Sequence, residues 1–158
     1  GVAMVSLYWR QGGASFRWAD YTAGSAIDVP TVPGRPWLAV NLSPAEDDAD
    51  WHGFGRAARL DSLPAGGMVQ VQLPDNAVIV ELSPDAVSSP EATLHPLFDD
   101  GVGGIDLQWR GSRLPDGRLL YAGLPAGTTL ELTGHDAGGR SQPREVSVPV
   151  GRLTVHWP

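Results

Sequence analysis

The stretch Leu119–Ser141, LLYAGLPAGTTLELTGHDAGGRS, decides the fold class. A short apolar run is followed by the turn Leu124–Gly127, in which a proline fixes φ and a glycine permits a positive φ. Leu130 and Leu132 then alternate with polar residues, which is the period-two pattern of a half-buried antiparallel strand. The stretch therefore predicts an all-β protein built as an antiparallel β-sandwich.

An earlier stretch repeats part of this pattern. Leu63–Gly66 has the same four residues as the later turn, and Met68–Leu73 alternates after it like a strand. Either the chain uses one supersecondary unit twice, giving a sandwich of two similar halves, or the two stretches share only a turn preference. In both cases we expect Leu63 and Leu124 to be buried beneath structural turns that form no binding site.

Length and composition indicate one globular unit. The chain has 158 residues, of which 42% are hydrophobic, so we expect a single sandwich over residues 1–158 with any internal joint at 84–100. The formal net charge is −7 and every basic residue is arginine, which argues against a nucleic-acid partner. No apolar run approaches the roughly 20 residues that span a bilayer. Without cysteine, disulfides and thiolate metal sites are excluded.

The first residues are predicted to form a hairpin. If Gly12–Gly13 is a two-residue turn, Trp9 lies opposite Phe16 and Leu7 lies opposite Trp18. The buried face would then hold Val5, Leu7, Trp9, Phe16 and Trp18, and the other face would hold Tyr8 against Arg17.

The tryptophans allow two interpretations. Core packing is the commoner role of aromatic side chains, because they supply large buried areas. Exposed, coplanar rings at Trp18, Trp37 and Trp51 would instead offer a stacking platform, so these three are the candidate ligand-binding residues for a small carbohydrate. Their exposure decides between the two interpretations.

The remaining patterns predict further short strands. These are Trp37–Leu42, Ala57–Leu60, Met68–Leu73, Ala77–Leu82, Ile105–Trp109, Val146–Val150 and Leu153–Trp157. Asp75–Asn76 is expected to turn between 68–73 and 77–82 in an antiparallel hairpin. Pro84–Pro96 is expected to be a crossing loop or the joint between two halves. No helix is expected, because the nearest candidate, Pro90–Leu97, is interrupted by a proline.

The acidic run Glu46–Asp50 is the one candidate for a metal site. Its carboxylates could gather calcium through hard oxygen ligands. When Asp48 is taken as the first ligand of an EF-hand-like loop, Arg59 falls where a bidentate glutamate is needed. We therefore expect a solvated loop and no metal.

No catalytic residue and no cofactor is predicted. The sequence has no nucleophile elbow, no phosphate-binding loop and no His-x-x-x-His pair. His135–Asp136 is the most suggestive pair, but neither a nucleophile nor a second base can be named beside it. A hydrolase with a site built from loops is kept as a third functional class.

The run Gly123–Pro143, GLPAGTTLELTGHDAGGRSQP, resembles the end of a fibronectin type III or related immunoglobulin-like module, in which a Leu-x-x-Gly turn leads into a strand and a loop. It is more similar to the three-tyrosine β-sandwich module at the membrane-proximal end of bacterial periplasmic sensor proteins. There, as here, a tryptophan precedes a short strand, a Leu-Pro-x-Gly turn and a further strand. The last strand of that module ends in a pair like Trp157–Pro158.

The resemblance implies a non-catalytic immunoglobulin-like module that is periplasmic or extracellular. It would act in signal transduction, as a signal-relay or interaction domain of a bacterial sensor or surface protein, and its partner would be another protein. The aromatic residues support a different class, a carbohydrate-binding module.

Overall fold

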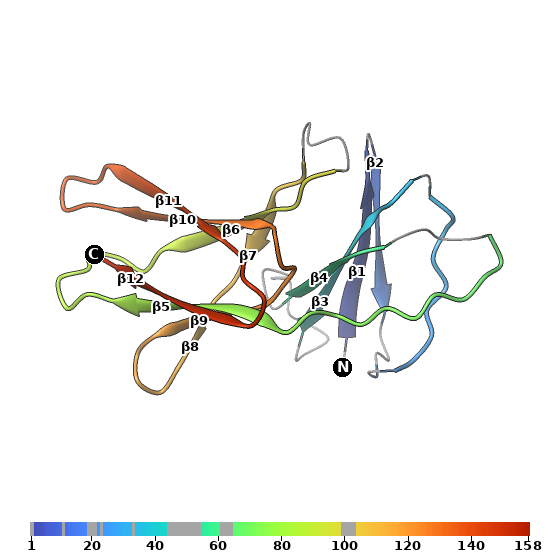
Figure 1. Ribbon diagram of the computed structural model, residues 1–158, viewed down its shortest axis with the longest axis horizontal. Coiled ribbons are helices and arrows are strands. Elements are labelled where there is room, and N and C mark those ends of the chain that lie inside the picture. The colour runs from blue at the N-terminus through green and yellow to red at the C-terminus, as the bar shows by residue number, and fades with distance from the viewer. Residues whose placement is uncertain are drawn as a thin grey trace.

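The computed structural model describes residues 2–10, 12–18, 22, 24–32, 34–43, 55–60, 65–98 and 104–158. Within these ranges the chain is all-β, as the sequence predicts, and it forms three four-stranded sheets. Figure 1 shows one sheet at the N-terminal end of the molecule and the other two stacked as a sandwich beside it. No helix in the described ranges is long and apolar enough to cross a membrane.

The N-terminal sheet is antiparallel and has the strand order β2-β1-β3-β4. Its strands are β1 (Val2–Trp9), β2 (Gly12–Trp18), β3 (Trp37–Ser43) and β4 (Gly55–Arg59). One face forms a small core around Val5, Leu7 and Leu38. Two connecting segments, 27–32 and 71–73, cover that core, so the face is closed by loops.

The β1–β2 hairpin has a different register from the one expected. Trp9 pairs with Gly12, not with Phe16, and Trp18 pairs with Ala3. β1 ends at Trp9 and β2 begins at Gly12, so both glycines belong to β2. The predicted turn at Gly12–Gly13 is therefore wrong.

The physical reason is that the two glycines make room for aromatic rings of the neighbouring strand. A Cβ atom on Gly12 would collide with the indole of Trp9, and one on Gly13 would stand 3.2 Å from the ring of Tyr8. The expected contact of Tyr8 with Arg17 is replaced by this pairing with Gly13. The predicted apolar face largely survives, because each partner shifts by an even number of residues and stays on the same side.

The sandwich contains the other eight strands. One sheet has the order β12-β5-β9-β8, from β5 (Asn76–Leu82), β8 (Ser112–Arg113), β9 (Leu119–Leu124) and β12 (Arg152–Trp157). The other has the order β11-β10-β6-β7, from β6 (Glu91–His95), β7 (Leu107–Trp109), β10 (Thr129–His135) and β11 (Ser141–Ser147). Only β12 and β5 run parallel among the strand pairs of the described residues.

The sandwich core joins both sheets and reaches the N-terminal sheet. Its central side chains include Leu94, Leu130 and Leu132, with Ala39 and Ala57 contributed by β3 and β4. Two hydrogen bonds cross between its sheets: the Trp109 indole donates to Ala122 O at 2.9 Å, and the Tyr121 hydroxyl donates to Pro90 O at 2.8 Å. Burial raises the pKa of Tyr121 to about 12.

The predicted strand Met68–Leu73 is absent. The segment is extended but pairs with no described strand, and Met68 is 89% exposed. The hairpin expected at Asp75–Asn76 is therefore wrong, and β5 pairs with β9 and β12 instead. The Asn76 amide holds this corner by donating to Leu124 O at 2.9 Å and accepting from Gly151 N at 2.9 Å.

The two Leu-Pro-Ala-Gly stretches share their turn and little else. Gly66 and Gly127 both have positive φ, 67° and 79°, as their sequence requires. Leu124 is fully buried as predicted, whereas Leu63 lies outside the described residues. Because a strand follows only the later turn, the hypothesis of two similar halves is wrong.

The segment expected to be a loop or a joint, Pro84–Pro96, contains β6 between β10 and β7. Its apolar alternation spans only Ala92 and Leu94, which is too short to stand out among the surrounding prolines. The division of the chain into one or two folding units stays a prediction.

Candidate functional site

The candidate site is the joint between the N-terminal sheet and the sandwich, where two side chains converge on one backbone carbonyl. Trp37 begins β3, and its register partner Arg59 ends β4. The Trp37 indole donates to Leu97 O at 3.1 Å, and the Arg59 guanidinium donates to the same oxygen at 3.2 Å. Leu97 lies just after β6, so these bonds join the two parts of the molecule. We call Trp37, Arg59 and Leu97 the Leu97 joint.

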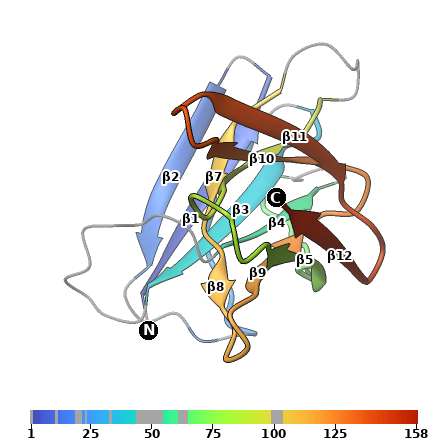
Figure 2. The ribbon, with the colours of Figure 1, turned by 90° about the vertical axis from the view of Figure 1, so that its left-hand side faces the viewer.

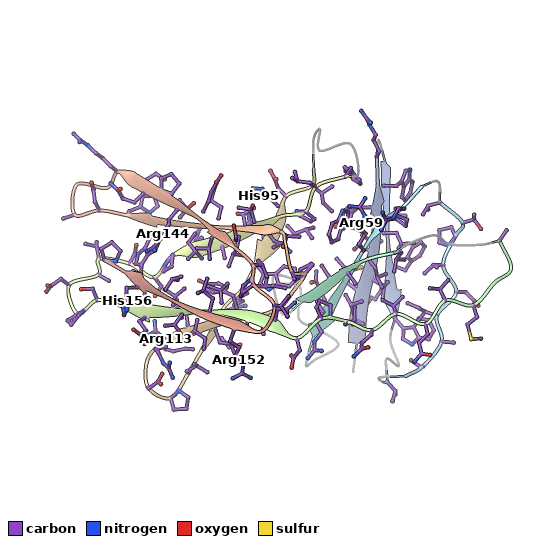
Figure 3. The ribbon with its side chains drawn as sticks, viewed as in Figure 1. Arg59, His95, Arg113, Arg144, Arg152 and His156 are labelled. Atoms are coloured by element: carbon purple, nitrogen blue, oxygen red, sulfur yellow. The ribbon has the colours of Figure 1, made fainter. Side chains whose placement is uncertain are left out.

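The Leu97 joint combines three interactions at a partly buried place. A carbonyl oxygen has two lone pairs and can accept both donors, one of them charged. The Arg59 guanidinium carbon also lies 5.4 Å from the centre of the Trp37 ring, within cation–π range. Trp37 is 5% exposed, so the indole is fixed by packing as well as by hydrogen bonding. Figure 3 shows Arg59 where the N-terminal sheet faces the sandwich.

A second contact between the two parts lies at the other end of β4 and depends on glycine. The backbone of β4 lies against the end of β9, where Gly123 has a φ of 75°. A Cβ atom on Gly123 would collide with Gly55 O and approach the Arg56 side chain to 2.6 Å. A Cβ on Gly55 would stand 3.2 Å from the Trp109 ring. Backbone therefore packs directly on backbone, which leaves little freedom for one part to move against the other.

His95 is the best-placed residue for acid–base chemistry. Its Nδ1 atom lies 2.8 Å from Asp106 Oδ1, and its Nε2 atom lies 3.8 Å from Glu131 Oε2. Asp106 can orient the imidazole, as carboxylates do in hydrolase sites. No hydroxyl group of the described residues is hydrogen-bonded to this ring. The arrangement offers a base or an ion pair, without a nucleophile.

A second histidine–carboxylate pair lies on the sandwich near the C-terminal strand. His156 Nδ1 is 2.9 Å from Glu81 Oε2. The pair borders an open depression of about 490 Å³ lined by Glu81, Leu82, Ser83, Pro84, His156, Trp157 and Pro158. Arg144 reaches across from β11 and donates to His156 O at 2.6 Å, which ties the edges of the two sheets together (Figure 3).

Neither histidine–carboxylate pair can be predicted from the sequence, because each depends on which strands pair. His95 and Asp106 are neighbours because β6 pairs with β7, and β6 was not recognisable. His156 meets Glu81 only through the parallel pairing of β12 with β5. Neither pairing leaves a local signal in the sequence.

Of the three predicted ligand-binding tryptophans, the structure describes Trp18 and Trp37. Trp37 is buried in the Leu97 joint, Trp18 is half-buried on β2, and Trp51 lies outside the described residues. Burial of Trp37 argues against a sugar-stacking role for that ring, since a sugar needs an open aromatic face. The ligand roles of Trp18 and Trp51 stay predictions.

The His135–Asp136 pair shapes a turn. Asp136 Oδ1 accepts hydrogen bonds from Gly138 N at 2.8 Å and Arg140 N at 2.9 Å. These donors, with the Gln142 amide, hold the pKa of Asp136 below its usual value, while His135 is exposed. The Asp136 carboxylate therefore stabilises the turn of the β10–β11 hairpin.

Metal binding has no assembled site in the ranges the structure covers, where no group of three His, Cys, Asp or Glu side chains is placed to hold an ion. The acidic run Glu46–Asp50 lies outside the described residues. Comparison of the chain with family models, with curated proteins and with solved structures finds no match.

Proposed function

We propose that the chain is a non-catalytic, immunoglobulin-like module that is periplasmic or extracellular, and that it serves as a signal-relay or interaction domain of a bacterial sensor or surface protein. The observation that carries this proposal is the Leu97 joint, which connects the N-terminal sheet to the sandwich. A relay domain has to pass a displacement from one end to the other, and a joint with two donors on one carbonyl suits that task.

The strand order of the sandwich supports the immunoglobulin-like part of the proposal. The neighbours β5-β9-β8 and β7-β6-β10-β11 have the same relations as strands B-E-D and C′-C-F-G of an immunoglobulin-type sandwich. The chain differs at one edge, because β12 takes the place beside β5 that strand A takes in those domains. β12 runs parallel to β5, so this edge is built differently.

The carbohydrate-binding alternative now depends on Trp18 and Trp51, since Trp37 is buried. The hydrolase alternative depends on the histidine pairs at His95 and His156. A glycan array and a panel of ester, peptide and glycoside substrates test these two classes. Saturable sugar binding that Trp18→Ala abolishes without a change in the melting temperature would favour the carbohydrate class.

The coupling of the two parts can be tested with a matched pair of arginine variants on β4. Arg59→Ala removes one donor of the Leu97 joint, whereas Arg56→Ala keeps both donors and removes a contact with Asp75 at 3.5 Å. We expect calorimetry of the wild-type protein and of Arg56→Ala to show one transition. Arg59→Ala should broaden or split that transition, because the two parts then unfold less cooperatively.

In the full-length protein, Arg59→Ala should weaken the signalling output or partner capture while Arg56→Ala leaves it near wild type. Cell fractionation with an antibody against this chain tests the location. A cytoplasmic location, or an output insensitive to Arg59→Ala, would contradict the proposal.

A further inference from the structure

The free edge of β2 differs from the other sheet edges in the described part of the chain. β7 and β8 are short, with three and two residues, and β4 lies against β9. β11 carries Pro143 among charged residues, and β12 carries Arg152 and His156. Short length, proline and charge are the usual protections of an edge strand. β2, GGASFRW, has seven residues, no proline and a single charge.

The side chains of β2 are arranged by size around its middle residue. The first three, Gly12, Gly13 and Ala14, are small, and the last three, Phe16, Arg17 and Trp18, are large. Ser15 stands at the centre, where its hydroxyl lies 2.6 Å from that of Ser6 on β1.

A second copy of β2 can be placed antiparallel to the first, with Ser15 opposite Ser15. The small residues of one copy then lie opposite the large residues of the other. Trp18 of the second copy falls opposite Gly12, and its Phe16 falls opposite Ala14. Its arginine falls opposite Gly13, so the two equivalent charges avoid each other. Opposed residues also lie on the same face, because each pair joins positions of equal parity.

We propose that β2 pairs with β2 of a second copy of this chain about a two-fold axis at Ser15, which makes the protein a homodimer. The interface is isologous, as in most homodimers, and it joins two four-stranded sheets into one continuous sheet. This inference is independent of the proposed function.

The glycines give the proposed interface specific contacts. The indole of Trp9 lies over Gly12, so the incoming Trp18 meets an aromatic ring there. The ring of Tyr8 lies beside Gly13, where the guanidinium of the incoming Arg17 can contact it as a cation–π pair. Each contact occurs twice because of the two-fold axis.

The molecule has room for this pairing. β2 and β4 are the opposite edges of the N-terminal sheet, and the sandwich packs on β4 and on Tyr8 of β1. Figure 2 shows β2 as the outermost strand of its sheet, on the left-hand side of the molecule. In the joined sheet the two β4 strands would be about 34 Å apart, from strand spacings of about 4.8 Å. The two sandwiches can therefore lie side by side.

Charge reversal at the axis tests the proposal directly. Ser15→Lys and Ser15→Glu each place two like charges opposite one another, so each variant alone should be monomeric. An equimolar mixture places lysine opposite glutamate and should restore the dimer. Both variants lose the contact with Ser6 equally, and their melting temperatures report whether they fold.

The measurement is sedimentation velocity, which separates the 16.7 kDa chain from a species of twice that mass. We expect a wild-type dimer, two monomeric variants and a dimeric mixture. A wild-type monomer at every concentration would overturn the proposal. A dimer that persists in Ser15→Lys would overturn it as well, because the contact would then lie elsewhere.

A cysteine at the axis gives a second readout, since the chain has no cysteine of its own. Opposed residues of an antiparallel pair have Cα atoms about 4.5–5.5 Å apart, which suits a disulfide. Ser15→Cys should form a covalent dimer under mild oxidation. The exposed control Gln72→Cys should not, and equal cross-linking of both variants would contradict the pairing.

Discussion

The N-terminal sheet and the sandwich enclose their cores in different ways. In the sandwich each sheet covers the apolar face of the other, and hydrogen bonds from Trp109 and Tyr121 cross between them. In the N-terminal sheet the apolar face is covered by segments 27–32 and 71–73, which form no strand. Two rigid faces cannot adjust to a lost side chain as easily as a loop can. The same kind of mutation should therefore cost more in the sandwich.

The largest effect is expected for Leu124→Ala. Leu124 is fully buried at the end of β9 within the sandwich core. Its removal should lower the free energy of unfolding by about 2–5 kcal/mol, as for other buried leucines. Urea denaturation measures this loss, with Leu120→Ala on the half-exposed side of the same strand as the control. A neutral Leu124→Ala variant that lost affinity for a ligand would make the turn a recognition loop.

Tyr121→Phe tests the hydrogen bonds between the sandwich sheets. The substitution leaves Pro90 O without the donor that now lies 2.8 Å away, inside the core. We expect a loss of about 1–3 kcal/mol in unfolding free energy, the usual cost of a buried group left unsatisfied. A loss below that range would show that the bond from Tyr121 to Pro90 O contributes little to holding the two sheets together.

The same residue predicts a pH dependence. Burial raises the folded-state pKa of Tyr121 to about 12 from its usual 10.0. The stabilisation that the protonated Tyr121 hydroxyl provides is therefore complete below pH 10, and it is lost as the pH rises from about 10 towards 12. Over this range the stability advantage of the wild type over Tyr121→Phe should shrink. An advantage that stays constant would mean that the hydroxyl is not buried in the folded protein.

Val32→Ala makes the matching test in the N-terminal sheet. Val32 is buried, but it belongs to a covering segment and not to a strand. Because that segment can move to fill the space, we expect a smaller loss, about 1 kcal/mol. A loss equal to that of Leu124→Ala in urea denaturation would show that the loop cover is as rigid as a sheet.

The same difference explains what the sequence could predict. Alternation in Thr129–His135 was readable, because β10 is flanked by β6 and β11 and has one buried face. Met68–Leu73 alternates too, since Val71 and Leu73 face the N-terminal core, yet its backbone pairs with no described strand. Side-chain burial on one side creates the period of two, and hydrogen-bonded pairing leaves no trace of its own.

The Leu97 joint lay beyond sequence reasoning for a related reason. The aromatic ring of Trp37 makes it a candidate ligand-binding residue in the sequence, but its partner is a backbone carbonyl, which has no residue-specific signal. Arg59 stands out in the sequence only as a break in a calcium motif. The predicted register of the first hairpin is wrong because two adjacent glycines are compatible both with a tight turn and with close packing against aromatic rings.

The smallest effect is expected at the β10–β11 turn. The Asp136 side chain stabilises this turn by accepting backbone hydrogen bonds, whereas in the first hairpin the glycines leave space for aromatic rings. The folded-state pKa of Asp136 lies below the usual 3.8, chiefly because Arg140 N donates to the carboxylate. The carboxylate therefore stabilises the folded protein at pH values above 3.8. This stabilisation is lost as the pH falls below 3.8 through the folded-state pKa. Because the side chain is partly exposed, the effect is small.

The variant Asp136→Asn should therefore melt slightly below the wild type at pH 6, and the difference should shrink as the pH falls below 3.8. Differential scanning calorimetry at both pH values measures it, with Asp28→Asn as the control for removal of an exposed carboxylate. A difference that grows on acidification would have the wrong sign, because a group with a lowered folded-state pKa can only lose its contribution there. In that event the turn would be held by Gly139 and its positive φ of 75° instead of by the carboxylate.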